Sequence, residues 1–210
     1  MKKGFTLAEV LITLGIIGVV AAMTMPTLIA NYRKKQTVTK LQKFYTIMSQ
    51  ALIRWETDEG IQPDDVEFTV TTDEDGKTNI LSDFMFWYDN NLSKYLNNVE
   101  KSVPKVVSPR YTIALNDGSG FNGYIAGKDT IYIFYCTNYK YCATESYDGK
   151  NTFLFRIYKG RIYAGQEYNL MTREKLLNNC KKATAGQCHN CAKLIQYDGW
   201  KIEKDYPIKF

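Results

Sequence analysis

Cysteine and histidine are the residue types in this chain whose spacing first suggests chemistry. Cys188 and Cys191 have the C-x-x-C spacing of many zinc sites, and His189 lies between them. A four-ligand site would also need Cys136 and Cys142, whose spacing is loose for a metal. A thioredoxin-like redox site is disfavoured because no βαβ pattern surrounds the motif. The sequence therefore predicts no metal and no cofactor.

Recognisable catalytic motifs are missing from the sequence. It has no glycine-rich phosphate loop, no GxSxG turn and no HExxH pair. The carboxylates of Asp64, Asp65, Asp73 and Asp75 fall in polar, turn-rich segments, where solvation is their ordinary role. The segment 73–76 is loosely similar to a calcium loop but lacks the bidentate glutamate at its far end. We therefore expect a protein that is not an enzyme.

One carboxylate stands in an unusual place. From Phe5 to Met25 the chain has 21 residues with a single charge, that of Glu9. A helix of this length spans about 30 Å, enough to cross the hydrocarbon core of a bilayer. A cleaved secretory signal is the rival interpretation, with a weak cleavage site at Val20-Ala21-Ala22, but the apolar region of such a signal is shorter. An acid inside a membrane helix usually marks a function or a partner.

The composition limits the remaining possibilities. The chain has 210 residues, of which 45% are apolar and 23% charged, so it suits a folded domain with an appendage and not a disordered chain. Twenty-seven basic and 22 acidic residues give a net charge of +5. For most of the 16 tyrosines, core and sheet positions are favoured over stacking on nucleic-acid bases.

The residues around Glu9 form a specific pattern. A short basic leader with Lys2 and Lys3 is followed by Gly4-Phe5-Thr6-Leu7-Ala8-Glu9 and then by the apolar run. This pattern resembles the processing site of type IV prepilins and of the related pseudopilins of type II secretion. The resemblance implies that prepilin peptidase, a membrane enzyme, cuts between Gly4 and Phe5 and methylates the new N-terminus. Glu9 then becomes the fifth mature residue, where this family carries its characteristic glutamate.

The resemblance implies a structural role. The chain would be a major or minor subunit of a type IV pilus or a type II secretion pseudopilus, held in the cytoplasmic membrane as a single-pass protein with its head extracytoplasmic. It would then polymerise through its N-terminal helix into a cell-surface or periplasmic filament. Its partners would be prepilin peptidase, other pilin subunits, the inner-membrane assembly platform and, before assembly, membrane lipid.

Two alternative functions stay open. The first is a minor pilin whose head is a binding module for DNA uptake, adhesion or recognition of a secreted substrate. The second is a membrane-anchored protein that never polymerises. Loss of Lys2 and Lys3 with the leader leaves 25 − 22 = +3 in side-chain charge, which does not by itself indicate a nucleic-acid partner.

Glu9 has a physical reason to pair with another subunit. Cleavage leaves a cationic N-terminus beside an apolar stretch, and a carboxylate among lipids or packed helices needs a positive partner. The N-terminus of a neighbouring subunit supplies one only when the two subunits are correctly staggered. We therefore predict that Glu9 sets the register of assembly.

The N-terminal helix is expected to continue beyond the membrane. Apolar residues recur at intervals of 3, 4, 3, 4 and 3, a seam that favours packing against the chain's own head over a free coiled coil. The helix should end near Asp58, before Gly60 and Pro63. Pro26 falls where many pilins carry a helix-kinking proline and is expected to kink or locally melt the helix. The seam consists of Val38, Leu41, Tyr45, Met48, Leu52 and Trp55.

The rest of the chain predicts an α+β head, which gives a pilin-like fold overall. A helix is expected over about 83–98 with Ser82 as its cap, and two more near 172–182 and 189–196. An antiparallel sheet of about four strands should pack on the seam, with the C-terminal helices partly covering its other face. The strands are expected at Tyr111–Leu115, Thr130–Tyr135, Thr152–Tyr158 and Arg161–Ala164, with turns at Asn116-Asp117-Gly118 and Lys159-Gly160.

The five cysteines all lie beyond the membrane segment, where disulfides are permitted. Cys136–Cys142 would close a short loop at the end of a strand. Cys180 has two possible partners, Cys188 and Cys191, of which Cys191 is favoured. Because five is an odd number, one thiol is left free or intermolecular.

The expected organisation has three parts: a leader over 1–4, a transmembrane and assembly helix over 5–58, and a globular extracytoplasmic head over 59–210. The tail, over Cys191 to Ile202 and Asp205-Tyr206-Pro207, also resembles the ending of a poorly described group of bacterial prepilin-type proteins, and the Asn116-Asp117-Gly118 turn and the region from Gly149 to Gly165 are similar to that group as well. Those proteins often carry a DxNG strand end, whereas this chain has Tyr135-Cys136-Thr137-Asn138, so no ion site is carried over. This second resemblance adds no known activity.

Overall fold

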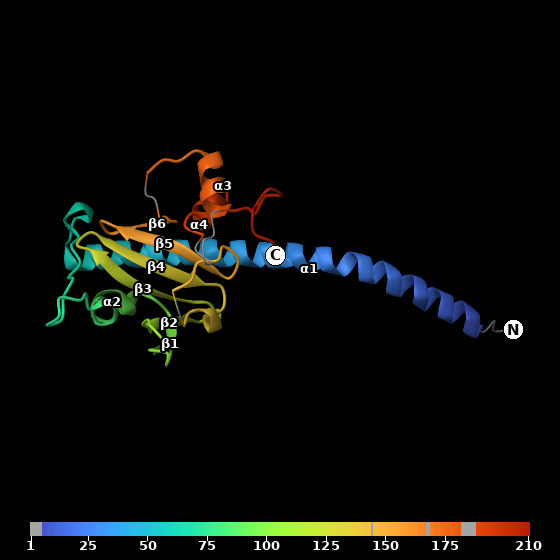
Figure 1. Cartoon of the computed structure of the whole chain (residues 1–210), viewed down its shortest axis with the longest axis horizontal. Coiled ribbons are helices and arrows are strands. Elements are labelled where there is room, and N and C mark those ends of the chain that lie inside the picture. The colour runs from blue at the N-terminus through green and yellow to red at the C-terminus, as the bar shows by residue number, and fades with distance from the viewer. Residues whose placement is uncertain (1–5, 144, 167–168, 182–187) are drawn as a thin grey trace.

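A computed structural model describes residues 6–143, 145–166, 169–181 and 188–210. Its first element is α1 (Leu7–Glu59), one helix of 53 residues that is about 80 Å long. The helix ends at Gly60, whose left-handed backbone (φ 65°) lets its N–H donate to the carbonyls of Glu56 and Thr57. Figure 1 shows the N-terminal half of α1 projecting beyond the head, which packs on the C-terminal half.

Pro26 does not interrupt α1. The helix is continuous through this residue, so the local melting that the sequence left open does not occur here. Figure 1 shows only a gentle bend in the projecting half. A proline inside a helix removes one backbone hydrogen bond, and the bonds on either side keep the remaining turns in register.

A six-stranded antiparallel sheet lies against the C-terminal half of α1, and its strands follow the chain in the order β1-β2-β3-β4-β5-β6. The central strands pair most extensively, and β4 pairs along its whole length with β5. The strands are β1 (Asn98–Ser102), β2 (Thr112–Leu115), β3 (Gly120–Gly127), β4 (Thr130–Cys136), β5 (Thr152–Tyr158) and β6 (Arg161–Ala164). The pilin-like α+β architecture is therefore confirmed.

The sheet has two strands more than the sequence predicts. The four predicted strands are present, and β1 and β3 are additional. β3 contains three glycines, which have low strand propensity. Gly123 is needed there because a Cβ would meet the ring of Phe84 and the carbonyl of Tyr132. β1 is polar and largely exposed, so it carries no alternating apolar pattern.

The main core lies between α1 and one face of the sheet, with Phe44 at its centre. The Phe44 ring stacks on Tyr135 of β4, with 4.3 Å between centroids, and meets the edge of Phe155 of β5 at 5.2 Å. The predicted seam is confirmed, and Phe44 and Ala51 add to its buried face. Its fully buried members are Leu41, Met48, Leu52 and Trp55, while Val38 and Tyr45 are half-buried.

The predicted helix over 83–98 is shorter than expected and begins earlier. α2 spans Ile80–Trp87, and the chain continues as a π-helical turn, η2 (Tyr88–Leu92), and a 3-10 turn, η3 (Ser93–Tyr95). Ser82 is not the N-cap, because it lies within the first turn of α2 and Asn79 holds the cap position. The Ser82 hydroxyl donates to the carbonyl of Asn79.

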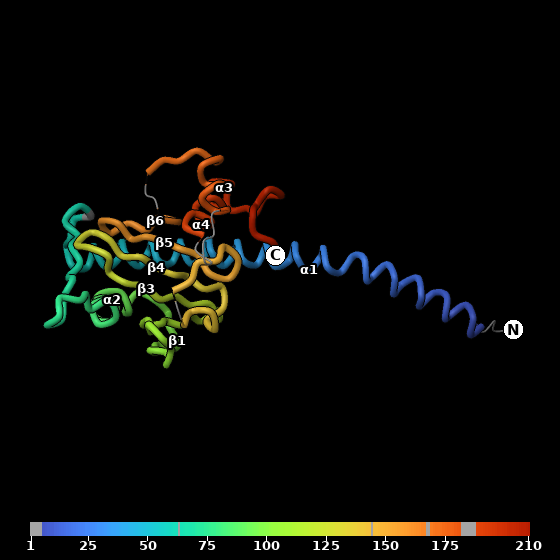
Figure 2. The backbone as a smooth tube through the Cα atoms, in the orientation of Figure 1, coloured from blue at the N-terminus to red at the C-terminus, as the bar shows by residue number. Residues whose placement is uncertain are grey.

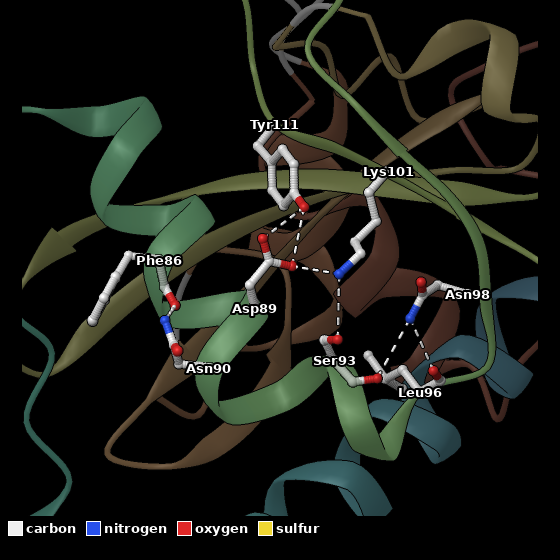
Figure 3. Close-up of polar contacts among 8 residues, drawn as sticks. All are labelled: Phe86, Asp89, Asn90, Ser93, Leu96, Asn98, Lys101 and Tyr111. Atoms are coloured by element: carbon white, nitrogen blue, oxygen red, sulfur yellow. Dashed lines mark hydrogen bonds and ion pairs between the residues drawn. The ribbon is translucent and has the colours of Figure 1, made fainter.

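Asp89 fixes the point at which these helical turns meet the sheet (Figure 3). Its carboxylate accepts from the Lys101 ammonium of β1 at 2.6 Å and from the Tyr111 hydroxyl at 2.9 Å. Asn98 donates to the carbonyl of Leu96 at 3.1 Å, which holds the turn into β1. Burial, together with the bond to Asp89, raises the pKa of Tyr111 above its usual value. The helical turns end at Tyr95, and β1 begins three residues later at Asn98.

The C-terminal helices α3 (Arg173–Lys181) and α4 (Cys191–Tyr197) form where they are expected but on the other side of the sheet. Their apolar side chains belong to the same buried cluster as the α1 seam. Trp200, just after α4, contacts the ring of Tyr45 on α1 at 5.5 Å between centroids. The prediction that these helices cover the face opposite α1 is therefore wrong.

The face opposite α1 has its own small cluster. Phe134 and Leu154 point outward from β4 and β5, and Tyr147, from the segment between these strands, stacks on Phe134 at 5.4 Å. Strand alternation explains the division, because Phe134 precedes the inward-facing Tyr135. The segment between β4 and β5 thus covers part of the face that the sequence predicts the C-terminal helices to cover.

Candidate functional site in the N-terminal helix

The N-terminal half of α1 is a long apolar surface that the head does not cover. Thr37 is the first buried residue of the described helix. By length and composition α1 is able to cross a membrane, and no residue of its apolar N-terminal stretch is buried in the single chain. A helix that is apolar on all sides requires lipid or other helices around it. Its most exposed large residues include Leu7, Leu11, Ile12, Ile17, Met23 and Leu28.

Glu9 lies in the first turn of α1 and forms a capping box with Thr6. The Thr6 hydroxyl accepts from the Glu9 N–H at 3.3 Å. Oε2 of Glu9 accepts in return from the Thr6 N–H and from the Thr6 hydroxyl, each at 2.8 Å. These bonds satisfy backbone donors that every helix N-terminus leaves unpaired. The T-x-x-E signal for this box was present in the sequence and was missed.

The processing positions Gly4 and Phe5 lie outside the described residues. The described helix nevertheless begins immediately after them, with Thr6 as its N-cap. A cut after Gly4 would place the new amine one residue before Thr6, at the positive end of the helix dipole. Glu9 is the acid available in this first turn. The capping box shows that its carboxylate points toward the N-terminal end of the helix.

Two disulfides form in the head, between Cys136 and Cys142 and between Cys180 and Cys191. They are the pairs that the sequence analysis favours. The first closes the turn after β4, and the second joins α3 to α4. Cys188 is the free cysteine, and it is buried, so it is not placed to form an intermolecular bond.

The surroundings of Cys188 do not support the metal interpretation. Cys191 is engaged in its disulfide, so its sulfur is not available as a thiolate ligand beside Cys188. The Cys188 thiol donates to the carbonyl of Asp148 at 3.3 Å, and burial raises its pKa. The His189 ring packs against the edge of Tyr147, with 5.1 Å between centroids. In the described part of the chain, no three His, Cys, Asp or Glu side chains group as metal ligands.

The carboxylates singled out in the sequence have structural or solvated positions. Asp73 accepts from the backbone N–H groups of Asp75 and Lys77, which shapes its own turn. Asp64 is almost fully exposed and lies 3.7 Å from the Lys159 ammonium. They form no catalytic pair.

Comparisons with known proteins agree with this architecture. Residues 1–25 match the prokaryotic N-terminal methylation motif. That motif is the prepilin-type cleavage and methylation signal, and together with the long apolar helix and the sheet-containing head it marks a protein of the type IV pilin and pseudopilin class, whose members are generally structural and not enzymatic.

Residues 27–210 match a second family model, and the chain belongs to that family, a family of unknown function designated DUF6613. No curated protein and no solved structure matches the chain. The two matched regions meet at Pro26, within the uncovered half of α1.

Proposed function

We propose that this chain is a structural subunit of a type IV pilus or a type II secretion pseudopilus. Prepilin peptidase would remove residues 1–4 and methylate Phe5, leaving 5–58 as the transmembrane and assembly helix and 59–210 as the extracytoplasmic head. The observation that carries the proposal is the division of α1, whose C-terminal half is buried in the head while its apolar N-terminal half is uncovered.

The uncovered half of α1 suits two environments in succession. Before assembly it would lie in the cytoplasmic membrane, where lipid covers its side chains. In a filament the same side chains would contact the helices of neighbouring subunits. Because lipid tails are as apolar as leucine side chains, replacing lipid contacts by contacts with neighbouring helices gains little hydrophobic free energy. Packing between helices and the pairing of Glu9 must therefore favour the assembled state.

Glu9 is proposed to pair with the N-terminal amine of a neighbouring subunit. Oε2 already accepts the local bonds from Thr6, and a carboxylate has about four acceptor sites in its two oxygens. The capping box can therefore persist while the amine binds. The box would hold the carboxylate in one orientation, which reduces the side-chain entropy lost on pairing.

Mass spectrometry of the mature N-terminus tests the processing step. The expected N-terminal peptide begins with N-methylated Phe5 and contains Glu9. A Gly4→Glu variant should keep the leader, because the residue before the cut is changed. A native chain that begins with Met1, or one that begins beyond Ala22, would contradict the proposal.

Filament assembly tests the role of Glu9. Glu9→Ala should abolish or severely reduce filaments while leaving the chain inserted in the membrane. Glu59→Ala is the matched control, since it removes an exposed acid from the other end of α1, and it should assemble normally. Normal filaments from Glu9→Ala would show that this carboxylate does not set the register.

A further inference from the structure

A cationic cleft lies at the end of the head that faces the uncovered half of α1. Its volume is about 500 Å³. Arg33 and Lys40 reach it from α1, Lys140 from the turn after β4, and Lys150 from the segment before β5, with Phe210 beside them. Figures 1 and 2 show these connections and the C-terminus at the same end of the head. Residues far apart in the sequence thus bring four positive charges to one place.

Among the residues that the structure describes, no side-chain carboxylate pairs with the positive charges of this cleft. Lys40 donates to the main-chain carbonyl of Thr137 at 2.7 Å. Lys140 and Lys150 lie over aromatic rings, at 4.9 and 5.9 Å from the ring centroids. Over the described residues, no ion pair involves these three lysines or Arg33, although the neighbouring Lys43 pairs with Asp117 at 3.0 Å. A main-chain carboxylate at Phe210 would remove one charge and still leave the cleft cationic.

The position of the cleft along α1 corresponds to the surface of a bilayer. The uncovered apolar residues extend to Ile29, and Arg33 follows four residues later, about 6 Å further along the axis. Lys40 follows at roughly 16 Å. The headgroup layer on each side of a hydrocarbon core is about 5–8 Å thick. With the apolar half of α1 in the membrane, Arg33 would therefore lie within the headgroup layer, and Lys40, with the cleft that it lines, would lie just beyond that layer.

The opposite end of the head has the opposite character. Asp73, Glu74 and Asp75 lie in an exposed turn after the C-terminal end of α1, and Asp64 and Asp65 are exposed nearby in sequence. An anionic bilayer would attract the end with the cleft and repel the acidic end. This asymmetry favours a head that stands upright on the membrane.

We propose that the cleft binds the phosphate group of an anionic phospholipid in the leaflet from which the head projects. Ammonium and guanidinium groups are the donors that proteins use for phosphate, and clusters of them beside a membrane helix bind anionic headgroups. The inference rests on the proposed function in one respect, that the N-terminal half of α1 lies in the membrane. It adds a lipid ligand that holds the head of the stored subunit in one orientation before assembly.

Hydrogen exchange of the full chain in nanodiscs tests this proposal. The chain is compared in phosphatidylcholine alone and in phosphatidylcholine with 30 mol% phosphatidylglycerol, a probe composition. Amides of 137–141 and 148–151 should exchange several-fold more slowly in the anionic nanodiscs. Added salt at 0.5 M should remove the difference, because it screens charges exposed to water. Millimolar inorganic phosphate should not reproduce it in phosphatidylcholine; if free phosphate does so, the lipid assignment is overturned.

Paired charge reversals show whether the cleft itself is responsible. Lys140→Glu with Lys150→Glu should abolish the lipid-dependent protection. Lys77→Glu with Lys128→Glu makes the same charge change at the acidic end and should keep the protection. Lys128 lies at that end, where its main-chain carbonyl accepts a hydrogen bond from the Phe68 N–H. Should the first pair destabilise the head, the neutral pair Lys140→Gln with Lys150→Gln provides the same test. Protection that survives both cleft variants overturns the proposal.

The remaining outcomes separate this inference from the proposed function. Slow exchange of α1 over residues 7–29 in either nanodisc shows that the helix is inserted. Fast exchange there would contradict the membrane role of α1 and with it the lipid site. Slow exchange in α1 with unprotected cleft loops would overturn the lipid site alone. Protection of the cleft only in assembled filaments would assign it to a second copy of the chain instead.

Discussion

Gly160 lies where the turn between β5 and β6 approaches α1, and its lack of a side chain leaves room for Glu56 of that helix. Lys159 and Gly160 both have left-handed backbones (φ 47° and 68°) in the tight turn between β5 and β6. A Cβ on Gly160 would overlap the carboxylate of Glu56, which is buried near the end of α1 and pairs with Arg161. The turn therefore needs glycine for its backbone conformation and also for the space it leaves to an ion pair.

Gly160→Ala should destabilise the head by about 2–3 kcal/mol. Left-handed backbone costs a residue with a Cβ roughly 1–2 kcal/mol, and displacement of the buried Glu56 adds to that cost. Gly118→Ala is the control, because Gly118 has a similar φ of 75° but no atom near its Cβ position, and it should lose only about 1 kcal/mol. Denaturant unfolding measures both values, and equal losses would show that the Glu56 contact does not matter.

Asp148 organises the segment that covers the outer face of the sheet. Its Oδ1 accepts from the N–H groups of Lys150, Asn151 and Thr152 at 2.7–2.9 Å. Partial burial by itself raises the pKa of Asp148, but these hydrogen bonds outweigh it, so the pKa lies below the ordinary value of 3.8. A depressed pKa means that the folded state favours the ionised carboxylate.

This depressed pKa predicts a pH-dependent contribution to stability. The contribution is complete above pH 3.8, the ordinary value, and is lost as the pH falls through the lower pKa of the folded state. Asp148→Asn should therefore cost about 1 kcal/mol at pH 7, a modest figure because water screens this partly exposed site. Unfolding curves of both proteins between pH 7 and pH 2.5 should converge at the acid end. A difference that does not depend on pH would contradict the assignment.

At the scale of elements, the sequence predicts well what depends on local pattern. The seam of α1, the turn at Lys159-Gly160 and four of the six strands follow from periodicity and turn residues alone. Phe44 was missed because it lies beside a strict heptad seam, and α1 buries a wider face than such a seam provides. β3 was missed because close approach of the Phe84 ring requires a glycine, which weakens the strand pattern.

The candidate sites also differ in whether the sequence alone can reveal them. The processing motif and Glu9 are contiguous in sequence, so they could be found without a structure. The cationic cleft could not, because Arg33 and Lys150 are more than a hundred residues apart and meet only when the head packs on α1. The side of the sheet that α3 and α4 cover was likewise a matter of tertiary packing, which an amphipathic pattern does not specify.

The two disulfides join neighbouring elements and should contribute similarly to stability. They close loops with sequence separations of 6 and 11 residues. In the chain-entropy account each is worth about 2–3 kcal/mol, since the dependence on loop length is logarithmic. Cys136→Ala with Cys142→Ala, and Cys180→Ala with Cys191→Ala, should each lose about that much in denaturant unfolding. Alkylation of the unreduced, unfolded native chain should label one thiol, Cys188; labelling of three or five would contradict the pairing.

At the scale of the whole molecule, one helix serves two kinds of packing. Its C-terminal half is part of the core of the head, and its N-terminal half meets no other part of the described chain. The charge distribution follows the same axis, with the cationic cleft at the junction of the halves and the acidic turn at the far end. Because α1 is one continuous helix from Leu7 to Glu59, force applied to its N-terminal half would be transmitted directly to the head.

The division of α1 predicts that stability and assembly can be damaged separately. Leu41 is fully buried and Leu14 is 59% exposed, so the same change to alanine has different consequences at the two sites. Leu41→Ala should lower the free energy of unfolding of the head by about 2–5 kcal/mol, as for other buried leucines. Leu14→Ala should leave unfolding in detergent within about 0.5 kcal/mol of the native value but reduce filament yield or thermal stability, because helices of neighbouring subunits would pack less completely there. Unfolding in detergent and electron microscopy of sheared filaments measure the two effects. If Leu14→Ala destabilised the head, or filaments were unchanged by substitution throughout residues 7–29, the exposed half of α1 would not be the assembly surface.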